Sequence, residues 1–407
     1  MESCYIGIDL SDKNTIVSFY QPHMKEPATT GTIAGSEIYT IPTLLAKKKH
    51  LGQWYYGDEA RKMAKTSEVI CLDGLLRRAV SGEIIRIEEE TYESWELLGV
   101  FLKKVMEIPM KLGNIPRCDR LILSVERLSR ENMEIFWKIA PKLGLRPEQF
   151  MVIDHKESFY YFALSQQEEL WLHDVYLFEY DQENMHYIGL KRNPRTTPQV
   201  VTMRESVRTS LVGDRDEAFL RIIQKAFENQ IISTVYLVGE GFESKWMKHS
   251  LTYLCRGRRV FLGNNLFSKG ACYAGYIRDH EEAWKCIYMG ENEMKFNLSL
   301  KTKEKGNLSF YTLISAGKNW FEAKGQCEVI LSGTPEIDFW KQLPNSREAV
   351  IETLELTDLP QRPDRTTRLR ITVTAIADDA VDVEIRDLGF GEIFKATDKV
   401  WKYTMTM

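Results

Sequence analysis

Two strands joined by a short polar turn near the N-terminus constrain the fold of this chain more than any other feature. In residues 5–10, isoleucine alternates with smaller side chains, which is typical of a strand with one buried face. Residues 11–14 are mostly short polar side chains that bond their own backbone, and residues 15–19 are β-branched or aromatic. The sequence therefore predicts a β-hairpin whose first strand ends near an acidic residue, Asp9.

A second segment with the pattern strand, polar turn, strand follows at residues 175–190. Its turn region is acidic, and Glu179, Asp181 and Glu183 are candidates for a divalent-cation site. Their spacing matches no calcium-binding loop. We therefore favour a solvated turn and predict no metal site.

Between the two hairpins the pattern changes to alternating strands and helices. A buried strand at residues 119–125 precedes a helix for which Ser129 is the expected N-cap and which we expect Pro141 to kink. A strand at residues 151–153 then leads into a buried helix at residues 157–164. Helical periodicity also appears at residues 92–112 and 214–229, and a further buried strand at residues 234–238.

Composition excludes several classes of protein. The chain has 407 residues, of which 43% are hydrophobic, so two or three domains with sizeable cores are expected. The net charge of −4 gives no electrostatic reason to expect a nucleic acid or an anionic membrane as partner, and we interpret the basic cluster at residues 256–259 as a solvated turn. No secretory signal is visible, and no stretch approaches the roughly 20 apolar residues of a membrane helix. We expect a cytoplasmic protein.

The seven cysteines are scattered and never form a C-x-x-C pair. Their odd number and their spacing argue against a disulfide framework and against a zinc site. We interpret them as reduced, mostly buried thiols.

The pattern of apolar and polar residues changes at about residue 291. Short alternating strands separated by turn signals follow one another, and their regular spacing predicts an antiparallel β-sandwich. The expected strands lie at residues 294–300, 308–313, 327–331, 351–354, 367–375 and 381–385.

The first hairpin resembles the first phosphate loop of the heat-shock 70 kDa (DnaK-like) chaperone family, which belongs to the actin/hexokinase ATPase superfamily. That loop runs roughly Ile-Gly-Ile-Asp-Leu-Gly-Thr-Thr, and Asp9 and Leu10 match it. Ser11, Asp12 and Lys13 replace its glycine and two threonines. The scaffold of the loop is thus similar, whereas its phosphate-binding chemistry is altered.

Later segments resemble the same family in order and spacing. Residues 175–190 fall at the second phosphate loop, whose consecutive glycines are replaced here by residues 180–184. Gly239 matches the first glycine of the adenosine loop, Glu240 replaces the second, and Gly241 follows. Two positions fall near family catalytic residues: we interpret His155 as structural and Arg77 as an arginine on a surface helix.

This resemblance implies an α/β two-lobed actin-like ATPase fold with reduced peripheral subdomains, followed by a C-terminal antiparallel β-sandwich similar to the DnaK substrate-binding β-domain. The expected domains are lobe I at residues 1–165, lobe II at 166–285 and the sandwich at 291–407. The interval between residues 190 and 235 has room for a strand, a loop and one helix, so the adenine-clamping subdomain IIB is reduced or absent. Too few residues follow the sandwich for the family's helical lid.

The resemblance also gives a candidate cofactor site, to be occupied only if a nucleotide binds. We predict no catalytic residue and no metal ligand. The residues that would contact ATP or ADP are Asp9, Ser11, Asp12, Lys13, Asn14, Glu179, Gly239 and Gly241.

Because both glycine-lined phosphate contacts are lost, we favour a pseudo-ATPase without a cofactor. It would be a non-catalytic scaffold that binds an unidentified protein or peptide through residues 291–407. One alternative is an atypical Mg-ATP-dependent, chaperone-like ATPase in which Asp9 orients a magnesium-bound water and Lys13 neutralises phosphate charge. A further alternative is an actin-like self-assembling protein.

Overall fold

A computed structural model describes residues 2–33, 37–112, 115, 117–304 and 306–407. The chain divides into two compact units, one made of Met1–Lys191 with Met203–Trp284 and the other of Arg192–Thr202 with Lys285–Met407. Within the described residues, no helix is long and apolar enough to cross a membrane.

The first sheet of the first unit is built on the N-terminal hairpin, and it has the strand order β11-β10-β1-β2-β3, with β4 also paired to β2. β1 and β2 are antiparallel, whereas β10 is parallel to β1 and β11 is parallel to β10. The bounds of these strands are β1 Tyr5–Leu10, β2 Asn14–Tyr20, β3 Ala28–Thr30, β4 Ile41–Pro42, β10 Arg120–Val125 and β11 Phe150–Asp154.

The second sheet of this unit repeats the plan of the first. Strands β12 and β13 form an antiparallel hairpin, β16 is parallel to β12, β17 is parallel to β16, and β15 pairs with β13. Each sheet therefore contains a hairpin followed by two parallel strands. The bounds are β12 Asp174–Tyr180, β13 Asn184–Asn193, β15 Thr209–Ser210, β16 Ile232–Val238 and β17 Arg259–Leu262.

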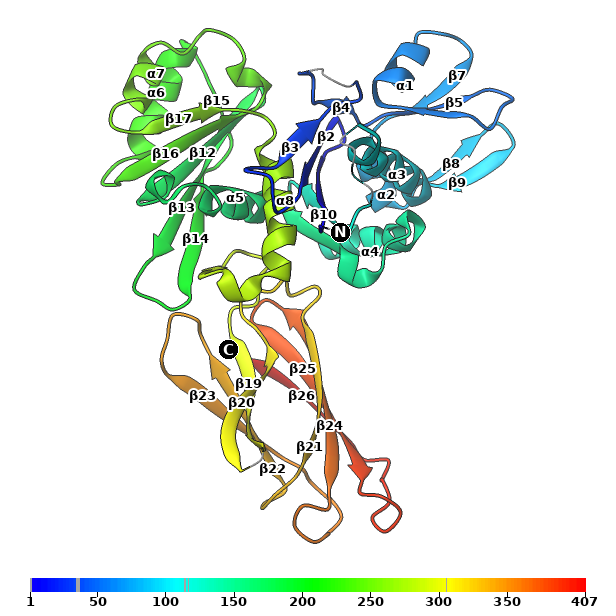
Figure 1. Ribbon diagram of the computed structural model, residues 1–407, viewed down its shortest axis with the longest axis vertical. Coiled ribbons are helices and arrows are strands. Elements are labelled where there is room, and N and C mark those ends of the chain that lie inside the picture. The colour runs from blue at the N-terminus through cyan, green and yellow to red at the C-terminus, as the bar shows by residue number, and fades with distance from the viewer. Residues whose placement is uncertain (1, 34–36, 113–114, 116, 305) are drawn as a thin grey trace. The chain divides into compact units, whose positions relative to one another are not determined.

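Helices pack on these sheets, and α8 runs beside α5 between them (Figure 1). Helix α8 approaches β1 closely because Gly7 has no side chain: a Cβ atom there would lie 2.1 Å from the backbone oxygen of Ser268. A Cβ on Gly270 would lie 2.1 Å from the backbone oxygen of Ser158 on α5. The helices of the unit are α1 Gly57–Met63, α2 Leu75–Ser81, α3 Ser94–Leu112, α4 Arg130–Ile139, α5 His155–Leu164, α6 Arg215–Ala226, α7 His249–Leu254 and α8 Leu266–Asp279.

Short elements complete the first unit. Two small antiparallel sheets, β6-β5-β7 and β8-β9, lie between β4 and α3 in sequence. The remaining bounds are β5 Leu45–Lys48, β6 Trp54–Tyr56, β7 Val69–Leu72, β8 Ile84–Ile87, β9 Glu90–Glu93, and the 3₁₀ turns Ala140–Leu143, Pro147–Gln149, Glu168–Leu170, Glu240–Phe242 and Glu281–Ala283.

A local signal in the sequence located the start of one helix. Ser129 caps α4 as predicted: its side chain accepts from the Asn132 amide, and the Asn132 side chain accepts from the Ser129 amide. At Pro141 the prediction of a kink is wrong in detail, because the α-helix already ends at Ile139 and a 3₁₀ turn follows.

Between residues 190 and 235, the described chain forms β14 (Gln199–Glu205), β15 and the single helix α6.

The second unit contains two four-stranded antiparallel sheets, with orders β20-β19-β22-β23 and β21-β24-β25-β26, and a short parallel pairing of β14 with β18 (Cys286–Tyr288). Six expected strands are confirmed with shifted ends, whereas β22 and β26 were missed. The bounds are β19 Asn297–Glu304, β20 Asn307–Ile314, β21 Lys324–Ile330, β22 Glu336–Gln342, β23 Ala349–Glu355, β24 Arg368–Ala377, β25 Ala380–Gly389 and β26 Val400–Thr406.

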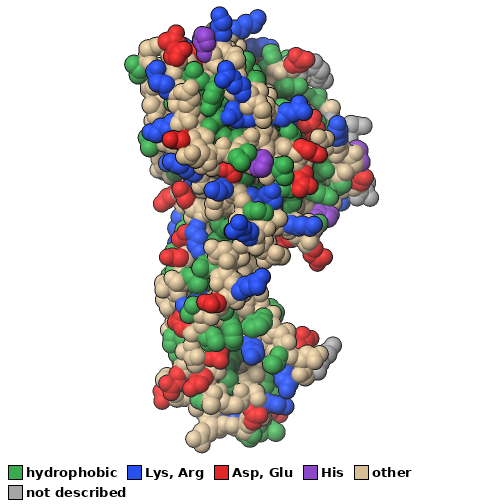
Figure 2. Space-filling model, turned by 90° about the vertical axis from the view of Figure 1, so that its left-hand side faces the viewer, with side chains coloured by type: hydrophobic (Ala, Val, Ile, Leu, Met, Phe, Trp, Pro, Cys, Tyr) green, Lys and Arg blue, Asp and Glu red, His purple; other side chains and the backbone are tan. Residues whose placement is uncertain are grey.

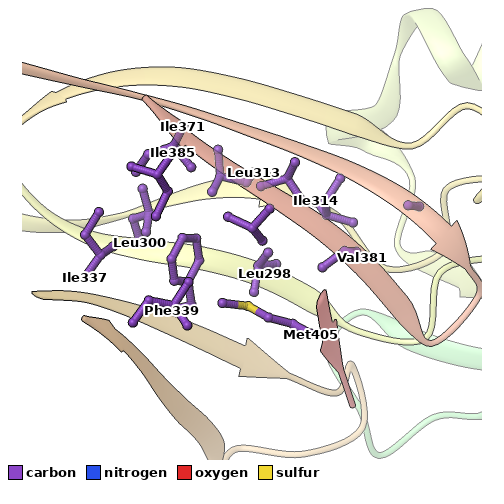
Figure 3. Packing of buried hydrophobic residues seen from close by; sticks show 14 of the residues in the cluster. Leu298, Leu300, Leu313, Ile314, Ile337, Phe339, Ile371, Val381, Ile385 and Met405 are labelled. Carbon is purple, nitrogen blue, oxygen red and sulfur yellow. The ribbon is translucent and has the colours of Figure 1, made fainter. Parts of the chain in front are cut away.

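Inward-facing side chains of both sheets form one hydrophobic core (Figure 3). Phe339 and Leu298 from one sheet pack in the same cluster as Ile371 and Ile385 from the other, and all four are fully buried. Alternation of apolar and polar residues along each strand puts one set into this core, as expected for packed sheets. The core therefore holds the two sheets together.

The thiol prediction is confirmed only in part. All seven cysteines are free, and Cys4 and Cys272 are buried. Cys71 and Cys255 are exposed, so the expectation of mostly buried thiols is wrong for these two. Cys71 lies within the short strand β7, and Cys255 directly follows α7.

A buried ion pair stabilises the edge of the sandwich core. The guanidinium of Arg362 donates two hydrogen bonds of 2.7 Å to the carboxylate of Asp387, which also accepts from the backbone amides of Gly389 and Thr397 and from the Thr397 hydroxyl. Burial alone would raise the pKa of Asp387, but these hydrogen bonds outweigh burial and hold that pKa well below its ordinary value.

We predict that Asp387→Asn lowers the free energy of unfolding of the second unit by about 3–5 kcal/mol, because it leaves the Arg362 charge buried without its carboxylate. Native-state hydrogen exchange of amides in β24 and β25 measures this quantity in the full chain. Asp379→Asn, at an exposed carboxylate, is the control and should change it by less than about 0.5 kcal/mol. Equal effects of the two substitutions would contradict the structural role of the pair.

Candidate functional site

A cleft of about 810 Å³ opens in the first unit where β1, β12 and β16 end. A volume of this size is typical of small-molecule sites. Six of the eight residues suggested for nucleotide binding line it, namely Asp9, Ser11, Lys13, Asn14, Glu179 and Gly239. Among the lining residues that the sequence did not single out as ligands are Asp58, Glu126, His155, Asn264 and Phe267.

The turn between β1 and β2 satisfies its own backbone. The amide of Ser11 donates to the backbone oxygen of Asn14 at 3.1 Å, and the amide of Asn14 donates to the Ser11 hydroxyl at 3.1 Å. The Ser11 hydroxyl in turn donates to the Asn14 backbone oxygen at 2.8 Å. These two amides are therefore not available to an anion in the cleft.

Asp12 lies outside the lining of the cleft. Its carboxylate accepts a 2.9 Å hydrogen bond from the backbone amide of Arg77, in the first turn of α2. An acidic group is favourable at a helix N-terminus, so Asp12 stabilises α2 rather than a ligand. Arg77 itself is an exposed residue of that helix, which confirms its interpretation as a surface arginine.

The turn between β12 and β13 is closed in the same way. The carboxylate of Asp181 accepts from the amides of Glu183 at 2.9 Å and Asn184 at 2.7 Å, and the Asp181 amide donates to the Asn184 backbone oxygen. Burial raises the pKa of Asp181, but these backbone hydrogen bonds outweigh it and lower that pKa overall. The Asp181 carboxylate therefore occupies the amides of Glu183 and Asn184 in this turn.

Gly239 and Gly241 are explained by the packing of Tyr180 against them. Gly239 has φ of 109°, and a Cβ there would lie 2.3 Å from the backbone oxygen of Tyr180. Its amide donates to the Asn264 side chain at 2.8 Å. Gly241 is buried, and a Cβ on it would lie 2.2 Å from the Tyr180 ring. Gly241 is not among the residues that line the cleft. The close approach of Tyr180 accounts for both glycines without a bound adenosine.

His155 is the main residue that sequence reasoning left out of the site. It is the first residue of α5, and its Nε2 lies 2.8 Å from Oδ1 of Asp9, with the ring stacked on Phe267 at 3.8 Å between centroids. Its side chain is only 12% exposed, and its Nδ1 has no hydrogen-bond partner among the described residues. The interpretation of His155 as structural stays compatible with this geometry, but its place is in the cleft beside Asp9.

The charge of Asp9 determines the protonation of this histidine. Burial by itself would lower the pKa of His155, but the charge of Asp9 and the hydrogen bond to it outweigh burial and raise that pKa. Glu179 and Glu126 act in the same direction. The floor of the cleft therefore holds a histidine–carboxylate pair in which Asp9 favours the protonated form of His155.

Other pairs distribute charge around the cleft. Burial lowers the pKa of His186, whose Nε2 lies 3.5 Å from the Glu179 carboxylate, so Glu179 faces a neutral ring. Glu126 pairs with Arg208 at 2.6 Å. In the part of the chain that the structure describes, no group of three or more His, Cys, Asp or Glu side chains has a geometry that could hold a metal ion.

Two contacts link the turn between β1 and β2 to the end of β16. Lys13 Nζ lies 3.5 Å from Glu240 Oε2, and the Asn14 side chain donates to Glu240 Oε1 at 3.4 Å. Glu240 thus places a carboxylate beside the Lys13 ammonium. Both partners are exposed, so the pair contributes little to stability.

We predict that His155 titrates above its ordinary pKa of about 6.5 in the native protein and at a lower pKa in Asp9→Asn, because only Glu179 and Glu126 then oppose the effect of burial. A raised folded-state pKa stabilises the fold below about pH 6.5, and this contribution is lost as pH rises through the raised value. The stability difference between native protein and Asp9→Asn should accordingly be larger at pH ~6 than at pH ~9. The imidazole proton shifts in NMR spectra measure the pKa directly.

Asp12→Asn is the matched control, since Asp12 lies in the same turn but contacts α2 instead of His155. It should leave the His155 titration unchanged. A native His155 that titrates below pH ~6.5, or an Asp9→Asn protein with an unchanged His155 pKa, would show that the pair does not control the charge of the cleft floor.

Comparison with known proteins gives a family for each part of the chain. Residues 26–291 match the model of the C-terminal region of a family of unknown function, DUF5716, and residues 293–407 match a domain of unknown function, DUF8552. A search of curated proteins finds no match. Because the first model covers more than half of the chain, the protein belongs to the DUF5716 family.

Proposed function

We propose that this chain is a DnaK-like member of the actin/hexokinase ATPase superfamily with a degenerate nucleotide site. Its first unit would be a two-lobed actin-like domain that turns over no ATP. Its second unit would be a sandwich similar to the DnaK substrate-binding β-domain. The whole would act as a non-catalytic scaffold that binds a protein or peptide.

The repeated sheet plan supports the superfamily assignment. In both sheets of the first unit, a hairpin is followed by two parallel strands, in the orders β11-β10-β1-β2 and β17-β16-β12-β13. The two hairpin turns and the end of β16 meet at the same cleft, where the resemblance puts the phosphate loops and the adenosine loop. The described interval between residues 190 and 235 offers no room for an adenine-clamping subdomain.

The observation that most supports a degenerate nucleotide site is that backbone amides of both turns already bond within their own turn. Five amides, those of Ser11, Asn14, Asp181, Glu183 and Asn184, already donate to acceptors of their own turns. A phosphate-binding loop needs such amides to converge on phosphate oxygens. Phosphoryl transfer depends almost entirely on positioning and electrostatic stabilisation, and neither turn supplies them.

Electrostatics act in the same direction. Asp9, Glu179, Asp181 and Glu240 are among the carboxylates that line the cleft. Its lysines and arginines are Lys13, which is paired with Glu240, Arg61, which is paired with Asp58, and Lys62. Two like charges at ~4 Å repel by about 1–4 kcal/mol, depending on screening. A triphosphate would meet several such pairs, and it would have to displace the Lys13–Glu240 contact as well.

Protein binding is assigned to the second unit because its surface exposes large apolar side chains. Leu308 is 68% exposed and Phe310 57%, both on β20. Exposed hydrophobic groups that lie close together often mark interaction sites. Figure 2 shows hydrophobic side chains gathered on the surface of this unit.

We predict no saturable heat change when ATP or ADP, with or without magnesium, is titrated into the full chain in a calorimeter up to ~1 mM nucleotide. Any dissociation constant would then be weaker than ~1 mM, which corresponds to a binding free energy of about −4 kcal/mol. A dissociation constant in the low micromolar range would overturn the proposal and favour the atypical ATPase. Lys13→Ala then locates the site, because loss of a phosphate-neutralising cation should weaken such binding at least tenfold.

A further inference from the structure

Strand β23 (Ala349–Glu355) forms an open edge in the second unit. It pairs antiparallel with β22 on one side, and no other described strand pairs with it. The opposite edge of the same sheet, β20, instead lies against β21 of the other sheet. An unpaired edge presents backbone donors and acceptors to any extended chain.

The direction of the free backbone groups follows from one hydrogen bond. The amide of Leu356 donates to the backbone oxygen of Pro335, on the β22 side. In an antiparallel ladder alternate residues point their N–H and C=O groups to opposite sides, so Ile351, Thr353 and Glu355 point theirs away from β22. Consistent with this, the hydroxyl of Tyr403 donates to the Glu355 backbone oxygen at 2.7 Å, so that oxygen is occupied and the edge open to a partner is at Ile351 and Thr353.

Apolar side chains flank this edge on the outer face of the sheet. Ile351 is 48% exposed and lies opposite Trp340 of β22. The Trp340 ring contacts Phe310 edge to face, with 5.1 Å between centroids. An incoming strand would therefore find an apolar surface next to the free amide of Ile351.

The charge near the edge is unbalanced. Glu355 lies directly opposite Glu336 of β22, and like charges at opposed positions destabilise a sheet. In the described residues no lysine or arginine lies within 4.0 Å of either carboxylate, and the same holds for Asp338 and Glu348. A cation supplied by a partner beside Glu355 would relieve this repulsion.

We propose that β23 is a docking edge for an extended segment of a partner protein, which adds to the sheet as a fifth strand. The segment carries an apolar residue against Ile351 and a lysine or arginine beside Glu355, four positions apart on the same face. This inference rests on the proposed protein-binding function and adds its location and the chemistry of the partner. A second copy of β23 is a poor occupant, because it would bring more carboxylates to the same edge.

The test uses the full chain and a fluorescein-labelled synthetic peptide with isoleucine and lysine four positions apart in a serine and threonine background. Fluorescence polarisation measures its binding. Two further peptides serve as probes of the mechanism. One has glutamate in place of lysine, and the other has N-methylated backbone amides that cannot pair with an edge.

Two substitutions at one position separate backbone from side chain. Thr353→Pro removes an N–H that points to the free edge, while the ladder to β22 keeps its hydrogen bonds. Thr353→Val keeps that N–H and removes only the hydroxyl that donates to Asp338 at 2.6 Å. We expect Thr353→Val to bind the lysine peptide as the native chain does, and Thr353→Pro at least about tenfold more weakly.

The glutamate and N-methylated peptides should also bind at least about tenfold more weakly than the lysine peptide. These two comparisons use the native chain, so they remain decisive if Thr353→Pro fails to fold. The edge assignment is overturned if the N-methylated peptide binds as tightly as the lysine peptide, or if no peptide binds saturably. In either case the calorimetric test of the nucleotide site is unaffected, so failure of the edge and failure of the proposed function can be told apart.

Discussion

The close contact between helix α8 and strand β1 organises the first unit. Because Gly7 and Gly270 have no side chains, the α8 backbone reaches both β1 and the first turn of α5. The hydroxyl of Ser158 donates to the Phe267 backbone oxygen at 2.5 Å, and the hydroxyls of Ser18 and Ser268 lie 2.7 Å apart. These small-residue contacts fix Phe267 at the start of α8, against which the His155 ring stacks, and so they define the floor of the cleft.

In both hairpin turns at the rim of the cleft, backbone amides donate to acceptors of the same turn. In each hairpin a polar side chain, Ser11 or Asp181, occupies the backbone donors that a glycine-rich loop would leave to a ligand. Asp12 is used to cap α2, and Glu240 neutralises Lys13. Side-chain caps of this kind compete directly with ligand binding for the same N–H groups. The amides of both turns are thus occupied by groups of their own turn.

The second unit shows how a small sandwich combines a hydrophobic core with a few buried polar links. Arg362 and Asp387 satisfy each other inside the unit, and Lys341 bonds both Glu352 of its own sheet and the Thr406 backbone oxygen of the other. Such links fix the relation of the two sheets, since an unpaired charge in the core would be costly.

The sequence by itself determined features that depend on neighbours along the chain. The first hairpin and the cap at Ser129 are each encoded within a few residues, and the structure confirms them. Strands β22 and β26 were missed although both alternate buried and exposed residues. In β22 a lysine lies on the inner face, and β26 is the last strand of the chain.

Only the tertiary structure decided what surrounds the cleft. Asp9 and His155 are separated by 146 positions, and their pairing depends on parallel strands that put the ends of β1 and the start of α5 side by side. The glycines at 239 and 241 carry no mark in the sequence that distinguishes ligand contact from the approach of Tyr180. Local patterns specify elements through short-range hydrogen bonds and periodic burial, whereas a site is made of long-range contacts that exist only once those elements have packed.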